Sequence, residues 1–320
     1  MAEHLDLGRL GLDRGGHLLL RRALRRLPVG GALRVVGEAP ALGLMLGAWC
    51  RSEGHEFQGE EAGGLLIRGP ARAQRWRGAT RAGGLTQVQD HPPASWGLAA
   101  RGTLVEAGSP SFSFRLADKA QLWTEEAGRF YAQAAAAQWD PATAIPWEAT
   151  VELPEEVEDA VVQLMSYLIE NENAALIVPA RFLGQVHPHF REIIQVLSIQ
   201  IADEARHVEV FTRRAGLKRA MLGLSTAGGQ QSLKTLLDEP DFALATLLLS
   251  VLGEGSFLSL LRFLQLHAPD PVTAEIARLT AIDEARHVAF GLSHLCYSVE
   301  QQPELRPRLA AAIRARHDSL

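Results

Sequence analysis

The pentapeptide Asp-Glu-Ala-Arg-His occurs twice in this sequence, at Asp203–His207 and at Asp283–His287. Both copies lie in segments whose apolar residues recur with the period of a helix. On a helix, a Glu and a His three positions apart project from the same face, so each copy can direct a carboxylate and an imidazole to one metal ion. Two such helices would supply half of the ligands of a dinuclear site.

The other half of such a site is one glutamate from each of two more helices. Over residues 242–269 the sole acid is Glu254, on an apolar stripe that must face inward. In an earlier helical segment Glu172 also falls on the apolar stripe, whereas Glu170 groups with polar residues, so we select Glu172. Glu172 and Glu254 precede the glutamates of the two pentapeptides by 32 and 30 residues. These near-equal offsets fit two similar helix pairs about a pseudo-twofold axis.

A single Glu-x-x-His is most often a surface pair, and the repeat changes that interpretation. Burying a carboxylate without a partner is costly, and four glutamates around two histidines would destabilise an empty bundle. Metal cations remove this cost. We therefore predict a dinuclear metal site.

From residue 116 onward the sequence has the pattern of a four-helix bundle. A first helix is expected over Asp118–Gln138, ending before Pro141, which lacks an N–H donor and restricts the residue before it. Four long helices of roughly 40 Å follow, each beginning near a proline, as helix first turns tolerate. The expected bounds are 154–182, 188–215, 240–267 and 271–297, with a short last helix at 305–316.

Residues 1–70 have the pattern of a small α/β sandwich. Helices are expected at 17–26 and 41–53, and strands at 32–36, 55–58 and 65–68, with a further candidate strand at 5–7. Residues 71–117, rich in Gly, Pro, Ser and Arg, are expected to form a linker with short strands around 102–114. The predicted class is α+β with two domains, 1–70 and 118–320, joined by the linker 71–117.

The N-terminal segment resembles the TusA/SirA-like sulfur-carrier fold in its order of elements and in short pieces of sequence. Leu10-Gly11-Leu12 stands where that family begins its Leu-Gly-x-x-Cys-Pro motif, and Trp49-Cys50-Arg51 and Gly54-His55-Glu56 also fit. The reactive Cys-Pro is absent, and Asp13-Arg14-Gly15 stands in its place. A carrier without this thiol cannot carry sulfur. The resemblance therefore implies a TusA-like domain that lacks its cysteine.

Residues 147–299 resemble the ferritin-like di-iron carboxylate superfamily, which includes multicomponent monooxygenase hydroxylases, ribonucleotide reductase small subunits and arylamine N-oxygenases. Asp-Glu-x-Arg-His is close to the sequence motif of the hydroxylases. Glu172-Asn173-Ala174-Ala175 resembles the Glu-Tyr-Ala-Ala of the hydroxylases on the first ligand helix. The resemblance implies two iron ions as the cofactor, with Mn/Fe as the alternative to Fe/Fe, since carboxylate and imidazole suit both. The implied metal ligands are Glu172, Glu204, His207, Glu254, Glu284 and His287.

Other residues of the pentapeptides would support these ligands. A metal-binding histidine usually donates its other ring N–H to a carboxylate, so we expect each aspartate to pair with the histidine of the other copy. The expected pairs are Asp203 with His287 and Asp283 with His207, with Arg206 and Arg286 holding the aspartates. The alternative is that all these residues are exposed helix charges.

The third ligand helix departs from the hydroxylases at Leu258, where they carry a polar Thr one turn after the glutamate. This departure weakens any transfer of their specific substrate chemistry. Gly253 and Gly255 flank Glu254, although a helical glycine costs about 1 kcal/mol against Ala. The two glycines have four possible explanations: a substrate pocket, room for the carboxylate to shift, a helix irregularity or close helix packing. The sequence does not distinguish among them.

The resemblance implies an O₂-activating oxidase or oxygenase that oxidises a small organic substrate with electrons from a reductase or ferredoxin. A ferritin-like iron-binding or peroxide-scavenging protein and a non-catalytic metal-binding subunit are the alternatives. Storage proteins are usually bare bundles, whereas about 150 residues precede the bundle here. No catalytic side chain is assigned beyond the metal centre, and a homodimer is left open.

Bulk features argue against several other classes. The only cysteines, Cys50 and Cys296, are far apart, which argues against a disulfide framework or a zinc–thiolate site. No phosphate-binding glycine motif occurs. No apolar run reaches the roughly 18 residues of a membrane span, and acids precede the first apolar run, unlike in a signal peptide. We expect a cytoplasmic protein without a membrane-spanning segment.

Charge differs between the two parts of the chain, with a balance of +5 over residues 1–115 and −10 over residues 116–320. One face of the N-terminal unit is expected to be basic, because it carries Arg14, Arg21, Arg22, Arg25 and Arg26. An acidic reductase, an acyl carrier protein or a nucleic acid are candidate partners for it, and a solvated helix face is the simpler alternative. No interleaved aromatic residues support nucleic acid.

Overall fold

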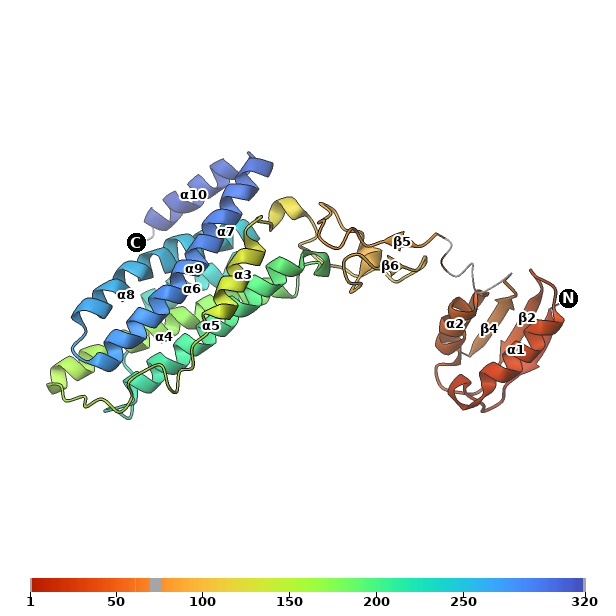
Figure 1. The fold of residues 1–320 in the computed structure, drawn as a ribbon, viewed down its shortest axis with the longest axis horizontal. Coiled ribbons are helices and arrows are strands. Elements are labelled where there is room, and N and C mark those ends of the chain that lie inside the picture. The colour runs from red at the N-terminus through yellow and green to blue at the C-terminus, as the bar shows by residue number, and fades with distance from the viewer. Residues whose placement is uncertain (1, 61, 70–75, 77, 319–320) are drawn as a thin grey trace. The chain divides into compact units, whose positions relative to one another are not determined.

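The computed structural model describes residues 2–60, 62–69, 76 and 78–318 (Figure 1). The chain forms two compact units. The first comprises Met1–Arg81 and Thr103–Ser109, and the second comprises Ala82–Gly102 and Pro110–Leu320. The expected domain boundary at residues 70 and 71 lies outside the described residues.

The first unit is a mixed four-stranded sheet with two helices (Figure 1). The sheet has the order β1-β2-β4-β3, with β1 and β2 parallel and the other neighbours antiparallel. The elements follow the sequence expectation to within two residues at each end. They are β1 Glu3–Asp6, α1 Gly16–Arg26, β2 Ala32–Val36, α2 Leu42–Glu53, β3 Glu56–Glu60 and β4 Gly63–Ile67.

Both helices of the first unit pack on one face of the sheet. Leu33 and Val35 of β2 are fully buried with Leu20 of α1 and Leu46 of α2, whereas Arg34 between them is exposed. This alternation is the pattern of a strand with one covered face. Among the described residues of this unit, the buried side chains are apolar apart from the Cys50 thiol.

The segment predicted as a linker is largely part of the two units. Its short strands are β5 Thr80–Arg81 and β6 Leu104–Val105, which pair with each other. Arg101 is 6% exposed and binds the carboxylate of Glu192 at 3.0 and 2.6 Å. The backbone N–H of Gln89 donates to Nε2 of His189 at 2.9 Å. Residues 82–102 thus pack against the start of a long helix instead of forming a free connection.

The second unit contains the long helices of the predicted bundle (Figure 1). Aspartate side chains cap two of them, because Asp241 and Asp270 accept hydrogen bonds from the backbone N–H groups of Leu244 and Thr273. The helices are α3 Ala127–Ala136, α4 Glu155–Leu183, α5 Arg191–Ala215, α6 Ala227–Asp238, α7 Phe242–Thr246, α8 Gly255–His267, α9 Pro271–Gln301 and α10 Leu305–Asp318. The four predicted long helices correspond to α4, α5, α7 through α8, and α9.

One helical expectation was wrong, and one helix was missed. The helix expected over Asp118–Gln138 is a single 3-10 turn, Lys119–Gln121, followed by the shorter α3. Asp118 caps this turn, and Leu122 then leaves the helical region so that the chain can enter the core. Helix α6 was not predicted, because Gly228 and Gly229 in its first turn disfavour a helix.

Helix α7 continues into α8 through a π-helical segment, η6 Leu247–Glu254. Such segments are rare and are frequently found at functional sites. A side chain at Gly255 would meet no neighbour, and one at Gly253 would meet only the carbonyl oxygen of Leu248 in the same helix. The two glycines therefore accompany a helix irregularity and not close helix packing.

One helical stretch among the described residues, Phe242–His267, is long and apolar enough to cross a membrane. We expected no apolar run of about 18 residues, and this stretch corrects that expectation. Its mean hydropathy reaches 1.8 over an 18-residue window, although single polar residues interrupt the apolar run. The finding rests on length and composition alone, and interior helices of a bundle have the same properties. This stretch carries Glu254, whose side chain is buried in the bundle.

Candidate metal centre

The six predicted ligands lie together in the interior of the second unit. They come from all four long helices: Glu172 from α4, two from α5, Glu254 from the end of the π segment and two from α9. None is more than 4% exposed, and the full set is Glu172, Glu204, His207, Glu254, Glu284 and His287.

The ligands lie between two apolar clusters of the bundle. On α4 one cluster ends at Ile169 and the other begins at Ala174, so Glu172 falls in the gap. On the α7–α8 helix Glu254 likewise lies between Leu249 and Leu261 of the two clusters. The apolar packing on both sides keeps water away from the charged layer, which strengthens every electrostatic interaction within it.

The ligand atoms form two overlapping groups of four. Atoms of Glu172, Glu204, His207 and Glu284 lie within 4.8 Å of one another, as do atoms of Glu204, Glu254, Glu284 and His287. Glu204 and Glu284 belong to both groups. Because they belong to both groups, these two glutamates would help to hold both ions of a metal pair, and each of the other four residues would help to hold one.

Several of the atoms that could bind a metal ion in this cluster are buried and make no hydrogen bond. They are Oε1 of Glu172, Oε1 of Glu204, Oε2 of Glu254, both oxygens of Glu284 and Nδ1 of His287. Three of these oxygens nevertheless lie 3.0 to 3.5 Å from a histidine Nδ1, without hydrogen-bond geometry: Oε1 of Glu204 and Oε2 of Glu284 from His287, and Oε1 of Glu284 from His207. Buried polar atoms are nearly always paired in folded proteins. So many unpaired acceptors in one layer fit a site that binds cations.

Burial raises the pKa of Glu172 and of Glu254 well above the usual value, because each charged carboxylate lies in an apolar interior beside other carboxylates. Burial opposes the charge of His207 and His287 as well, yet the surrounding carboxylates raise the pKa of both imidazoles. Burial also raises the pKa of Glu204, but the neighbouring histidines outweigh it and the net pKa is lowered. In the absence of metal, protons would therefore bind to the carboxylate and imidazole groups that could otherwise bind metal cations.

Each histidine has its two ring nitrogens in different surroundings. Nδ1 of His207 is 3.1 Å from Glu204, and Nδ1 of His287 is 3.0 Å from the same glutamate. Nε2 of His207 is 3.2 Å from Asp283, and Nε2 of His287 is 3.3 Å from Asp203. The structure thus brings together the two expected pairs across the bundle. With Nε2–H donating to an aspartate, Nδ1 keeps a lone pair toward the glutamates.

The arginines of the pentapeptides lie beside the aspartates. Nη2 of Arg206 is 3.1 Å from Asp283 and also contacts Asp203, and Arg286 contacts Asp283. Asp203 and Asp283 are fully buried. The alternative that all four are exposed helix charges is therefore wrong for the aspartates.

Two residues after α3 were missed by the sequence reasoning. Nε2 of Gln138 donates to Asp203 at 2.8 Å, and Nε1 of Trp139 donates to Asp283 at 2.8 Å. The Trp139 ring also stacks on His207, with centroids 6.5 Å apart and an interplanar angle of 16°. No spacing rule connects these residues to the pentapeptides, and only the break before Pro141 drew attention to this stretch.

Glu254 has a further partner on α5. Nε2 of Gln200, which is 3% exposed, donates to Oε1 of Glu254 at 3.2 Å. Gln200 lies one turn before Glu204, so it shares the inward face of α5. The sequence reasoning missed Gln200 as well, although an amide on an apolar helix face four residues before a predicted ligand could have indicated it.

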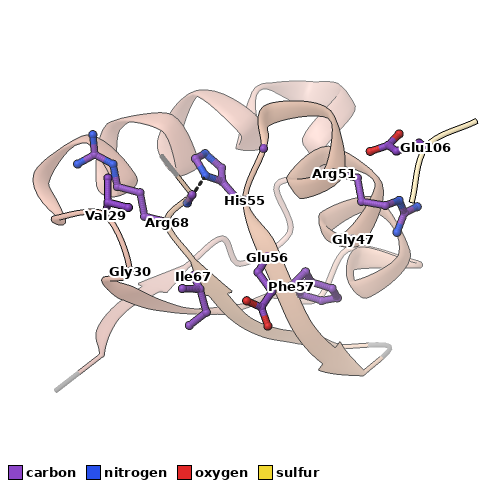
Figure 2. A pocket seen from close by; sticks show the side chains of 12 residues that line it. Val29, Gly30, Gly47, Arg51, His55, Glu56, Phe57, Ile67, Arg68 and Glu106 are labelled. Atoms are coloured by element: carbon purple, nitrogen blue, oxygen red, sulfur yellow. Dashed lines mark hydrogen bonds between the residues drawn. The ribbon is translucent and has the colours of Figure 1, made fainter. Parts of the chain in front are cut away.

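The first unit has a separate open cavity of about 640 Å³. Figure 2 shows His55, Arg51 and Arg68 among its lining residues. The backbone N–H of Gly69 donates a hydrogen bond to Nδ1 of His55 at 3.0 Å. Burial lowers the pKa of His55. Neither group of candidate metal ligands among the described residues lies in this unit, so its size does not make it the candidate site.

Neither a protein-family model nor a curated protein matches this chain. Among solved structures, a mutant R2-like ligand-binding oxidase with an anaerobically reconstituted Mn/Fe cofactor is 17% identical, with a TM-score of 0.50 over 62% of this chain and 78% of that one. A mutant with an aerobically reconstituted Fe/Fe cofactor gives the same values. A third, with an aerobically reconstituted Mn/Fe cofactor, is 18% identical at the same TM-score and coverage. At this identity the similarity is one of fold, and it agrees with the ferritin-like bundle expected from the sequence.

Proposed function

We propose that this protein is an oxidoreductase that activates O₂ at a dinuclear metal centre in the bundle and oxidises a small organic substrate. The single observation that carries the proposal is the pair of overlapping ligand groups that share Glu204 and Glu284. Two iron ions are the proposed cofactor, with Mn/Fe as the alternative. The cofactors in the similar structures, Mn/Fe and Fe/Fe, support a redox-active pair.

Two such ions, when bound, would supply the electrons that reduce O₂. The chain's own residues set the conditions for this chemistry. Asp203 and Asp283 fix the histidine rings by accepting Nε2–H, and Gln138 and Trp139 in turn fix the aspartates. Gln200 holds one oxygen of Glu254. Apolar packing on both sides excludes water. An electron donor, a reductase or ferredoxin, is a further part of the proposal.

The proposal is tested by anaerobic loading with Fe(II), elemental analysis and measurement of O₂ consumption with a chemical reductant. We expect two ions per chain and O₂ consumption that continues catalytically beyond the bound iron. Glu284→Ala, which removes a carboxylate from both groups, should lose both properties, whereas Glu170→Ala should keep them. Iron accumulation well above two ions per chain would favour storage, and bound metal without O₂ consumption would favour a structural site.

We further propose that the first unit is a docking module related to the TusA/SirA-like sulfur carriers that has lost their reaction. Its element order supports this relation, and Cys50 is not a substitute thiol, because burial raises its pKa to about 12. Removal of residues 1–70 should leave metal binding intact and change association with the electron donor. Loss of metal from a well-folded truncation would mean that the first unit contributes to the site.

A further inference from the structure

Every fourth residue from Phe242 to Glu254 faces the interior of the bundle. These residues are each at most 8% exposed, namely Phe242, Thr246, Ser250 and Glu254. The first three line one small cavity together with residues of α4, α5 and α9. Gln200 of α5 lines the same cavity and donates to Glu254. We call these four residues the inner stripe.

A regular α-helix cannot keep such a stripe on one side. With 3.6 residues per turn, four residues advance about 40° beyond a full turn, so Glu254 would point about 120° away from Phe242. In η6 the π-helical hydrogen bonds join residues five apart instead of four, so each turn holds more residues. Residues four apart then fall short of a full turn, which opposes the drift. The π segment therefore brings Glu254 to the same side as the start of α7.

A second stripe with the same spacing faces α10, which packs on α7, η6 and α9 (Figure 1). Ala243 and Leu247 are buried and Val251 is half-buried. All three belong to one apolar cluster with Leu305 and Leu309 of α10. In an α-helix Val251 would point about 80° away from Ala243. The outer stripe, Ala243, Leu247 and Val251, is therefore aligned beneath α10 in the π geometry and would not be in an α-helix.

Polar contacts locate α10 at both of its ends. Nη2 of Arg308 is 2.6 Å from Oδ2 of Asp241, the residue that caps α7 by accepting from the N–H of Leu244. Nη2 of Arg316 donates to Oγ of Ser232 on α6 at 2.6 Å. These contacts keep the apolar side chains of α10 above the outer stripe.

We propose that α10 is a positioning element of the candidate metal centre. Its contact with the outer stripe favours the π geometry of η6, and that geometry holds Glu254 in the ligand layer. Glu254 belongs to only one of the two ligand groups, the one that contains His287. Loss of the α10 contact should therefore weaken the binding of one metal ion and spare the ion held with Glu172 and His207. This inference rests on the dinuclear centre of the proposed function, and it names the element that controls one of its two metal positions.

The first test measures the π segment in metal-free, full-length protein. The double variant Leu305→Ala/Leu309→Ala removes two side chains that contact the outer stripe. Ile313→Ala is the matched control, because Ile313 lies on the same helix, is 46% exposed and is outside that cluster. Hydrogen exchange compares the amides of η6 with those of α4. In the double variant the η6 amides should gain at least about tenfold in exchange rate relative to those of α4, and in Ile313→Ala the ratio should equal that of the wild type. An unchanged ratio in the double variant would overturn the inference.

The second test measures anaerobic Fe(II) binding by calorimetry. The double variant should bind one ion as the wild type does and the other at least about tenfold more weakly, as when a residue that supports a metal ligand is lost. Ile313→Ala should bind both ions normally. In a Glu254→Ala background the remaining ion should not respond to the two α10 substitutions. Equal weakening of both ions, or no weakening of either, would count against the positioning role of α10.

O₂ consumption separates this inference from the proposed function. If the double variant selectively weakens one ion but the loaded wild type consumes no O₂, the positioning role stands and the oxidase proposal fails. If the loaded wild type consumes O₂ and the double variant binds both ions as tightly as the wild type, the oxidase proposal stands and the positioning role is overturned.

Discussion

The second unit buries two clusters of charged side chains, and they differ in how their charges are satisfied. In the first, the guanidinium of Arg214 is fully buried and donates to Glu158 at 2.7 and 3.0 Å, to Asp270 at 2.9 Å and to Thr273 at 2.8 Å. None of these side-chain atoms lacks a hydrogen-bond partner. We call these four residues the arginine cluster.

The ligand cluster, made of the six predicted metal ligands, is the opposite case. It contains four carboxylates and two imidazoles but no arginine or lysine, and five of its carboxylate oxygens make no hydrogen bond, although three of these five lie within 3.5 Å of a histidine Nδ1. The arginine cluster carries its own cation and stabilises the fold as it is. The ligand cluster carries no such cation, so protons or metal ions must offset its negative charge. Buried charge does not by itself indicate a functional site. Buried carboxylate oxygens that accept no hydrogen bond do indicate one.

The largest expected effect tests the arginine cluster. Arg214→Met would leave Glu158 and Asp270 buried without their cation, which typically costs about 3–5 kcal/mol of unfolding free energy. Urea unfolding of the metal-free protein measures the change. Arg278→Met is the control, because Arg278 makes a partly exposed pair with Glu275 that water screens. If Arg214→Met lowered the unfolding free energy no more than Arg278→Met does, the arginine cluster would not depend on its own cation, and the contrast with the ligand cluster would fail.

The next effect tests the ligand cluster with a cation. Anaerobic Fe(II) at about 1,000 times its dissociation constant should add about 4 kcal/mol to the unfolding free energy. Arg214→Met should retain this increment if the variant folds, because the arginine cluster supplies no metal ligand. Glu284→Ala should lose it. An equal increment in Glu284→Ala would place the metal outside the ligand cluster.

A smaller effect concerns pH. The pKa values of His207 and His287 are raised in the folded state, so their contribution to stability is fully present below about pH 6.5 and is lost as pH rises through the folded values. Metal-free protein should lose up to about 1.4 kcal/mol per pH unit for each proton involved. Arg214 keeps its charge over this range, because the carboxylates around it raise its pKa further.

Iron should reverse this pH dependence, since the cation competes with protons for the same atoms and binds more tightly as pH rises. Chemical unfolding between pH 6 and 9, with and without anaerobic Fe(II), measures both slopes. A metal-free stability that increases with pH over this range would contradict the raised histidine pKa values.

The same comparison shows what the sequence can predict. The ligand cluster was predicted because its residues obey local rules, namely Glu and His three apart on a helix and acids on apolar stripes. The arginine cluster was not predicted, because Arg214 is 56 residues from both Glu158 and Asp270 and no short-range pattern links them. Gln138 and Trp139 were missed for the same reason, since they reach the aspartates from a segment without regular structure.

The fold was predictable to a similar extent. Long helices and strands with clear periodicity were placed within a few residues, and α6 and the extent of α3 were not. The π segment could be anticipated only as one of several explanations for Gly253 and Gly255. The segment packs closely against α9, where a side chain at Gly291 would lie 2.7 Å from Ser250 of η6, and no short-range sequence pattern shows this contact.

The smallest effect compares Glu172 with Glu170 in metal-free protein. Glu172 is 1% exposed and its raised pKa reports the cost of burying it, so Glu172→Ala removes an unfavourable burial and should not lower stability in the absence of metal. Glu170 is half-buried outside the ligand groups, and Glu170→Ala should change stability by under about 0.5 kcal/mol.

Fe(II) separates the two variants. Glu172→Ala should lose one of the two ions or weaken its binding by at least about 10–100-fold, the range known for residues that merely support a metal ligand, while Glu170→Ala should bind both. Helix α4 continues through Pro179, which lies seven residues beyond Glu172, so a proline kink does not rotate Glu170 inward. Elemental analysis together with unfolding at each Fe(II) concentration gives both quantities. If Glu172→Ala destabilised the metal-free protein as Arg214→Met does, the ligand cluster would be a second structural network, and the contrast between the two clusters would be lost.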